Sequence, residues 1–328
     1  MYMNKTLREL LTDPAIAAIG REAISNRDLS KEEFYDWTLA EIAERMGWRI
    51  LNRGFTRLFR AAERGQYLYP LYDDAECAAE PARRRASIVY LPSDDPAADE
   101  RPFMLLVPGG GFVNVWNITE GWPMATYFNE RGYHAFVLTY QVDVEAAGVR
   151  AMGDVSRALE VIAAHREAFR VDPARYMTCG FSAGGYLVCL WNTSAGYSAY
   201  GKAKPAACIP VYPVTSYRLM AAEEWDEGED KDAFARSVTG CSMEGSCNSC
   251  FEIPLHPEGF PPTAIFAAAE DDMVDPEHSR SLARALEGAG IPCYLEIGPT
   301  GGHGFADGEG MCMEGWPFRA LDLIEQHI

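Results

Sequence analysis

The feature that most restricts the fold of this chain is a series of short apolar runs separated by helical stretches. Six runs are almost continuously apolar: FMLLV (103–107), HAFVLTY (134–140), RYMTC (175–179), ACIPVY (207–212), TAIFAA (263–268) and PCYLEI (292–297). Such runs are typical of strands covered on both faces. Helical patterns lie between or after them: 121–131, 149–168, 183–194, 277–289 and 316–327. The alternation predicts an α/β fold, with a mainly parallel sheet and crossover helices on both faces.

Two further β-rich runs, QYLYPLY (66–72) and ASIVYL (86–91), come before this series, and we expect them to form an antiparallel pair. Residues 1–64 have a helical pattern instead. TLRE (Thr6 to Glu9) and SKEE (Ser30 to Glu33) both match the capping box that begins a helix. We therefore expect residues 1–64 to form a helical N-terminal extension packed on a main domain of residues 65–328. A roof over the active site and a dimer contact are the alternatives.

The segment 216–260 interrupts the alternation of strands and helices. It contains EEWDEGEDKD followed by CSMEGSCNSCFEIPLHPEGF, and it is too long for a simple connection. We interpret it as an insertion that forms a cap or lid. Its acidic run is expected to be a solvated face, and repulsion of anionic substrates is the alternative.

Composition excludes some classes of partner. The chain has 328 residues, with 48 acidic and 29 basic side chains and a net charge of −19. This charge disfavours binding to nucleic acid or to an anionic membrane surface. No apolar run reaches the length of a signal peptide core or a transmembrane helix. Among nine cysteines, Cys179, Cys189 and Cys208 lie in apolar contexts, so we expect a reducing, cytoplasmic location.

A serine lies between two glycines where the run 175–179 meets the helical stretch 183–194. Gly180-Phe181-Ser182-Ala183-Gly184 matches G-x-S-x-G, in the strand–turn–helix context that this motif requires. Small flanking residues allow strand and helix to approach at the tight turn. The free N–H groups at the start of the helix favour negative charge near the serine. Ser182 is therefore the candidate nucleophile.

A serine hydroxyl needs a base, and the base needs an orienting carboxylate. Of six histidines, His303 lies in the glycine loop GPTGGHGFADG after the last apolar run. The run TAIFAA is followed by AEDDMVD, in which Asp271 is the preferred carboxylate and Asp272 the alternative. The resulting order is Ser182, Asp271, His303, the order of the α/β-hydrolase arrangement.

The oxyanion of an acyl-transfer reaction needs N–H donors. Pro108-Gly109-Gly110-Gly111 follows the run 103–107, and such a loop can bring bare backbone close to a substrate carbonyl. The second donor is expected from Ala183, directly after the nucleophile.

Together these segments resemble the esterase/lipase branch of the α/β-hydrolases. The resemblance rests on VPGGGF, GYHAFVLTY, VDPARYMTCGFSAGG, YPVTS, EDDMVDPEHS and GGHGF, over about residues 66–328. Among its members the chain is most similar to acetyl-esterase-like, carbohydrate-esterase and feruloyl-esterase relatives. The resemblance implies an α/β-hydrolase fold with an eight-stranded, mostly parallel sheet, and an acyl-enzyme mechanism without a cofactor.

The same resemblance implies roles for particular residues. Ser182 would be the nucleophile, Asp271 the acid and His303 the base, with Gly110, Gly111 and Ala183 as oxyanion donors. In the hormone-sensitive-lipase-like branch a histidine stands where this chain has Pro108, so the glycine amides that face the oxyanion are left open.

Residues after the glycine loop are candidates for substrate binding. Phe112, Trp116 and Trp122 either line the pocket or are core and rim aromatics. Asn117 and Glu120 are candidates for binding substrate hydroxyls.

The insertion carries a cysteine cluster. Cys241, Cys247 and Cys250 form C-x5-C-x2-C, with His256 beyond. Free thiols, a disulfide and a structural zinc site are the alternatives, since three thiolates and an imidazole can form a tetrahedral ligand set.

The leading hypothesis for function is a serine carboxylesterase acting on short-chain acyl esters, with acetylated carbohydrates as candidate substrates. The alternatives are a peptidase or lactonase on the same residues, or a binding protein of the same fold without catalysis. The expected partner is a small-molecule ester, with no cofactor. The oligomeric state is left open, with a homo-oligomer as one alternative.

Overall fold

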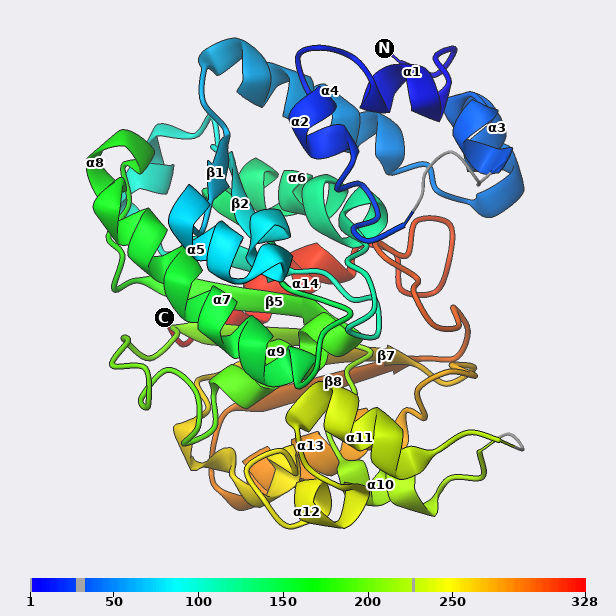
Figure 1. The fold of residues 1–328 in the computed structure, drawn as a ribbon, viewed down its shortest axis with the longest axis vertical. Helices are drawn as coiled ribbons and strands as arrows, with labels where there is room; N and C mark the ends of the chain where they lie inside the picture. Colours follow the sequence, from blue (N-terminus) through cyan, green and yellow to red (C-terminus); the bar gives the residue numbers. More distant parts are fainter. Residues whose placement is uncertain (1, 28–32, 226–227) are drawn as a thin grey trace.

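The structure is a computed structural model, and it describes residues 2–27, 33–225 and 228–328. An eight-stranded sheet forms the centre of the molecule (Figure 1). The strand order is β1-β2-β4-β3-β5-β6-β7-β8. The strands are β1 (Leu68–Pro70), β2 (Ser87–Leu91), β3 (Phe103–Val107), β4 (Ala135–Thr139), β5 (Tyr176–Phe181), β6 (Ala207–Val211), β7 (Thr263–Ala268) and β8 (Cys293–Gly298). β2 pairs antiparallel with both β1 and β4, and every pair from β4 to β8 is parallel. The predicted eight-stranded, mostly parallel sheet is confirmed.

The apolar runs form strands because both faces of the sheet are covered. Alternate side chains of β3 enter different cores: Met104 and Leu106 pack on one face, and Phe103, Leu105 and Val107 pack on the other. In the parallel part, Leu106 lies beside Cys179 and Cys179 beside Ile209. The carboxyl ends of β3, β5, β6, β7 and β8 therefore meet at one edge, where the candidate site residues follow them.

Helices form a layer on each face of the sheet (Figure 1). On one face lie α6 (Trp122–Glu130) and α14 (Trp316–Ile324). On the other lie α7 (Ala147–Ala164), α8 (Arg166–Phe169), α9 (Ala183–Trp191) and α13 (Glu277–Gly288). The predicted helix over 149–168 is divided at His165 into α7 and α8. Shorter elements join the strands: α5 (Asp74–Ala79), η3 (Pro81–Arg85), η4 (Pro96–Glu100) and the π-helical turn η5 (Asn117–Gly121).

The N-terminal segment is helical, as predicted. It contains α1 (Leu7–Leu11), α2 (Ala17–Gly20), η2 (Glu33–Asp36), α3 (Leu39–Met46) and α4 (Leu51–Arg64). The capping box of Thr6 and Glu9 is present at α1. The one predicted at Ser30 lies outside the described residues. A capping box that we did not predict, formed by Thr38 and Glu41, begins α3.

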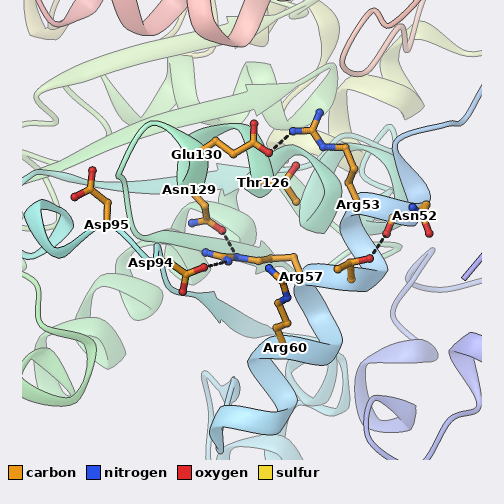
Figure 2. Close-up of a pocket in the computed structure, with 10 residues that line it drawn as sticks. Asn52, Arg53, Arg57, Arg60, Asp94, Asp95, Thr126, Asn129 and Glu130 are labelled. Carbon is orange, nitrogen blue, oxygen red and sulfur yellow. Dashed lines mark hydrogen bonds and ion pairs between the residues drawn. The ribbon is translucent and has the colours of Figure 1, made fainter. Parts of the chain in front are cut away.

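The helix α4 joins the extension to the main domain. Gly54 packs so closely on α6 that an added Cβ would lie 2.6 Å from Pro123 Cγ. Beside this contact is a polar cavity of about 420 Å³ (Figure 2). Three arginines of α4 and three carboxylates line it: Arg53, Arg57, Arg60, Asp94, Asp95 and Glu130. The charges balance, and Arg57 donates to Asn129 Oδ1 (2.7 Å) and Asp94 Oδ2 (2.9 Å). We interpret the charged residues that line this cavity as an ion-pair network that holds α4 against the main domain.

The extension also contacts the chain that follows the glycine loop. The Ser25 N–H donates to the Val115 carbonyl (2.9 Å), and the Ile118 N–H donates to the Ala23 carbonyl (2.8 Å). The Asn117 side chain adds a third bond, from Nδ2 to the Glu22 carbonyl (2.8 Å). These bonds hold the segment 115–118 against residues far away in the sequence.

The segment 216–260 folds into α10 (Tyr217–Ala222), α11 (Lys231–Thr239) and α12 (Met243–Cys247), followed by the short turns η6 (Ile253–Leu255) and η7 (Pro257–Gly259). Figure 1 shows these helices beside α13, at the end of the molecule opposite α1 to α4. Glu252 closes the segment on itself, because its carboxylate accepts from Ser216 Oγ (2.6 Å) and from the Arg218 N–H (3.0 Å).

Candidate active site

Ser182 occupies a sharp turn between β5 and α9. Its backbone has φ 51° and ψ −119°, a strained conformation for a residue with a side chain. The turn is possible because its flanking residues are bare. A Cβ on Gly180 would lie 2.2 Å from the Gly184 carbonyl oxygen, and one on Gly184 would lie 2.0 Å from the Val107 carbonyl oxygen. The turn therefore lifts the Ser182 hydroxyl above the carboxyl edge of the sheet.

His303 and Asp271 meet Ser182 at this edge. His303 Nε2 lies 2.9 Å from Ser182 Oγ, and His303 Nδ1 lies 2.8 Å from Asp271 Oδ2. An ionised carboxylate only accepts hydrogen bonds, so the proton belongs on Nδ1 and Nε2 is free to accept from the serine. The other carboxylate oxygen, Asp271 Oδ1, accepts from the N–H groups of Met273 (3.0 Å) and Val274 (2.9 Å). The structure brings together the three residues that the sequence order indicated.

The glycine loop lies beside Ser182, and its N–H groups differ in use. The Gly109 N–H donates to a side chain, Glu120 Oε2, at 2.6 Å. Gly110 and Gly111 both have positive φ, 133° and 62°. Their N–H groups, and that of Ala183 at the first turn of α9, make no hydrogen bond to the described residues. Gly111 and Ala183 also line the cavity at Ser182.

A cavity of about 510 Å³ opens beside the serine. Its walls come from the glycine loop, α9, the insertion and the aspartate loop. The apolar lining is Phe112, Ala183, Tyr186, Val214, Tyr217, Met220, Trp225, Phe234, Val238, Met273 and Val274. Four carboxylates are also part of the lining: Glu223, Glu224, Glu229 and Asp272. The insertion thus forms one wall of this cavity.

Only part of the expected substrate-binding set lines this cavity. Phe112 does, with φ 60°. Trp116 instead packs edge-on against Trp48 of the extension, with 6.1 Å between ring centroids. Trp122 is buried in the core beside Phe55. Of the two alternatives for Trp116 and Trp122, pocket lining is not observed, and their rings pack against the N-terminal extension as core and rim aromatics.

The prediction is wrong for Asn117 and Glu120 as ligands of substrate hydroxyls. Asn117 is fully buried, and its Nδ2 donates to the Glu22 carbonyl and to Thr139 Oγ1 (2.9 Å). Glu120 lies behind the glycine loop, where burial raises the pKa of its carboxyl. The available signal for Glu120 was its position, as the one charged residue between the glycine loop and Glu130. The Tyr212 hydroxyl donates to Glu120 Oε1 (2.9 Å), but nothing in the sequence pattern distinguishes Tyr212 from other residues of the apolar run 207–212.

The cysteine cluster does not form a metal-ligand set. Within residues 2–27, 33–225 and 228–328, no three His, Cys, Asp or Glu side chains are arranged to hold a metal ion. Cys241, Cys247 and Cys250 are free thiols, and His256 Nε2 lies 3.1 Å from the Ser249 carbonyl oxygen. In the described part of the chain these side chains therefore form neither a zinc ligand set nor a disulfide.

None of the helices within residues 2–27, 33–225 and 228–328 is long and apolar enough to cross a membrane.

The sheet order, the helix layers and the serine turn are those of an α/β-hydrolase. The chain belongs to the BD-FAE family, whose model matches residues 89–286, more than half of its length. Solved structures share the fold. The acetyl ester-xyloside bifunctional hydrolase from Caldicellulosiruptor lactoaceticus is 23% identical, with a TM-score of 0.61 over 79% of this chain and 94% of that chain. The carboxylesterase Cest-2923 from Lactobacillus plantarum is 22% identical, with a TM-score of 0.59 over 74% and 92%.

Curated relatives are larger proteins. The chain is 26% identical over 208 residues to the acetylxylan esterase of Xylanibacter ruminicola, covering 62% of this chain and 40% of that protein. It is 28% identical over 239 residues to endo-1,4-beta-xylanase B of Butyrivibrio fibrisolvens, covering 69% and 35%. The match thus spans well under half the length of either relative.

Proposed function

We propose that this protein is a serine carboxylesterase that hydrolyses short-chain acyl esters, with acetylated carbohydrates as its substrate class. The observation that carries the proposal is the unbroken line of hydrogen-bond distances from Ser182 Oγ through His303 to Asp271, 2.9 Å and 2.8 Å. The substrate class is supported by the names of two relatives, an acetylxylan esterase and an acetyl ester-xyloside hydrolase.

The proposed mechanism uses protein groups and water. His303 Nε2 takes the proton of Ser182 as Oγ attacks the ester carbonyl carbon, and the carbonyl π electrons move to oxygen. In this proposal the N–H groups of Gly110, Gly111 and Ala183 stabilise that oxyanion, and Gly111 and Ala183 line the cavity at Ser182. The imidazolium then protonates the leaving alkoxide as the C–O bond breaks, which leaves an acyl-serine. Water, deprotonated by His303, attacks the acyl carbon; the bond between this carbon and Ser182 Oγ then breaks, the imidazolium returns its proton to Oγ, and the acid is released.

Asp271 acts in this mechanism through His303. Its carboxylate fixes the tautomer with the proton on Nδ1 and stabilises the imidazolium. Because Asp271 Oδ1 is held by two backbone N–H groups, its orientation does not depend on the histidine. His303 is thereby kept in one orientation toward Ser182.

The test is labelling and turnover. A fluorophosphonate should modify Ser182 in the folded protein, and Ser182→Ala should lower kcat for p-nitrophenyl acetate by about 10³–10⁶-fold. Ser194→Ala is the matched control, since Ser194 is exposed in the turn that follows α9, and it should behave as wild type. Turnover of acetylated xylo-oligosaccharides against longer p-nitrophenyl esters tests the substrate class. An unlabelled Ser182 would overturn the proposal, and turnover of peptides without esters would replace it by the peptidase alternative.

A further inference from the structure

A buried carboxyl group lies behind the glycine loop and has no part in the mechanism above. Glu120 belongs to the π-helical turn η5, and only 6% of it is exposed. Single π-helical turns are frequent at functional sites because they redirect side chains that an α-helix would place elsewhere. A buried carboxyl is costly unless its oxygens are matched by donors, so its partners show what it is for.

The first partner is the glycine loop. The Gly109 N–H donates to Glu120 Oε2 at 2.6 Å, a short bond of the kind made to an ionised acceptor. Gly109 is also pressed against the nucleophile, because a Cβ added there would lie 2.8 Å from Ser182 Cβ and 3.0 Å from Glu120 Oε2. The Gly109 backbone therefore lies directly between the Glu120 carboxyl and Ser182, in close contact with both.

The second partner leads to the base. The Tyr212 hydroxyl donates to Glu120 Oε1 at 2.9 Å, and the Tyr212 ring lies against the His303 ring with 4.9 Å between centroids. Both carboxyl oxygens thus accept hydrogen bonds, which suits the ionised form. One carboxylate connects the backbone beside the nucleophile with the ring that packs on the base.

The charges around this group restrict what it can influence. Tyr140, Cys179 and Tyr212 are the neutral titratable groups near Glu120, and burial raises the pKa of each, so they keep their protons near pH 7. Burial also raises the pKa of the Glu120 carboxyl, while the bonds from Gly109 and Tyr212 and the nearby His303 lower it. Glu120 and His303 therefore interact electrostatically across the Tyr212 ring.

We propose that Glu120 is a positioning residue of the esterase site. Its carboxylate holds the glycine loop against Ser182 through the Gly109 N–H, and places a second negative charge, besides that of Asp271, on the side of His303 covered by Tyr212. The groups facing His303 are then Asp271 from the loop after β7, Ser182 from the turn, Tyr212 after β6, and Glu120 behind Tyr212. This inference rests on the proposed function.

The test is Glu120→Gln, which keeps the shape and an acceptor for Gly109 but removes the charge. We expect kcat for p-nitrophenyl acetate to fall about 10- to 100-fold, less than the ~10²–10³-fold for losing a whole oxyanion donor. KM should stay within about twofold, since the interaction is with the transition state. In wild type, protonation of the Glu120 carboxyl, whose pKa burial raises, should contribute to the acid limb of the kcat/KM profile, and Glu120→Gln should lose that contribution.

Asp154→Asn is the matched control. Asp154 is another buried carboxylate that accepts from a tyrosine hydroxyl, Tyr72 (2.7 Å), and a backbone N–H, Gln141 (2.7 Å), but it does not line the cavity at Ser182. It should change stability and leave kcat and the pH profile as in wild type. A purely structural role for Glu120 would make the two variants alike.

Tyr212→Phe keeps the test valid should Glu120→Gln fail to fold. It retains the ring against His303 and removes one donor to the carboxylate, so kcat should fall on the order of 10-fold. Wild-type kcat and pH profile in a folded Glu120→Gln, or wild-type kcat in Tyr212→Phe, would overturn the inference. A wild-type protein that neither turns over esters nor reacts with fluorophosphonate would instead overturn the proposed function.

Discussion

Asp271 holds His303 with one carboxylate oxygen while the other is anchored by the main chain. The contact between His303 Nδ1 and Asp271 Oδ2 is 2.8 Å, and the Met273 and Val274 N–H groups donate to Oδ1. The carboxylate is therefore oriented before the histidine approaches.

Asp271→Asn should lower kcat on the order of 10⁴-fold with little change in fold, as an amide at this position favours the wrong tautomer of His303. Steady-state kinetics on p-nitrophenyl acetate, with circular dichroism for folding, is the measurement. Glu270→Gln, one residue earlier and exposed, should match wild type. Near-normal kcat in folded Asp271→Asn would assign the orienting role to another carboxylate, with Asp272 the first to examine.

Two glycines in helices should respond oppositely to alanine. Gly184→Ala should lower the free energy of unfolding by about 1–3 kcal/mol or more, because the new Cβ meets the Val107 carbonyl at 2.0 Å. Gly153→Ala, in the middle of α7 where a Cβ has no neighbour within 4 Å, should raise it by about 0.5–1 kcal/mol. Urea denaturation measures both. Equal effects would mean that the close approach at the serine turn is misplaced.

Arg57→Ala should destabilise the attachment of α4. The guanidinium donates to Asn129, Asp94 and the Pro92 carbonyl, so its loss should cost about 1.5–3 kcal/mol. Arg60→Ala removes an exposed arginine of the same helix and should stay within about 0.5 kcal/mol of wild type. Chemical denaturation distinguishes them. A costly Arg60→Ala with a silent Arg57→Ala would contradict the network in Figure 2.

Asp154 should make stability depend on pH. Burial raises its pKa from 3.8 to about 6 in the folded protein. Between these values the folded state binds more protons than the unfolded state, so stability should fall as pH rises through the window, by at most about 1.4 kcal/mol per pH unit from this group. The difference in unfolding free energy between wild type and Asp154→Asn, measured from pH 4 to pH 7, isolates the effect. A difference that stays constant across the window would refute it.

The carboxylates of the substrate cavity should select against anionic esters. Glu223, Glu224, Glu229 and Asp272 line it, so p-nitrophenyl hemisuccinate should have at least about 10-fold lower kcat/KM than p-nitrophenyl propionate at low salt. Raising ionic strength from about 0.01 M to about 1 M should narrow the gap, because the screening length falls from about 30 Å to about 3 Å. A cationic ester should show the reverse trend. If the ratio of kcat/KM between the neutral and the anionic ester does not change with salt, the cavity discriminates between the two esters by shape and not by charge.

Much of the scaffold was predictable because burial leaves a clear trace in the sequence. β3 and β7 begin and end where the apolar runs do, and β5 continues two residues beyond its predicted end, into the serine turn. Ser182, Asp271 and His303 each follow a predicted parallel strand. Because the carboxyl ends of parallel strands share one edge of the sheet, their positions in the sequence predicted that they would lie together. Their roles in catalysis stay a prediction.

The orientation of the residues after the glycine loop was not predictable. Trp116 and Asn117 turn toward Trp48 and Glu22, contacts between positions far apart in sequence, which no local pattern encodes. The π-helical turn adds to this, since it rotates Glu120 away from the face that an α-helix would give it.

The bonds from residues 22–25 to 115–118 make the reactive end of the sheet depend on chain outside the family match of 89–286. A protein trimmed to residues 89–286 would lose the bonds that hold residues 115–118, and it would also lose His303. A smaller scaffold built to keep this arrangement of the glycine loop therefore needs the N-terminal residues 22–25 as well.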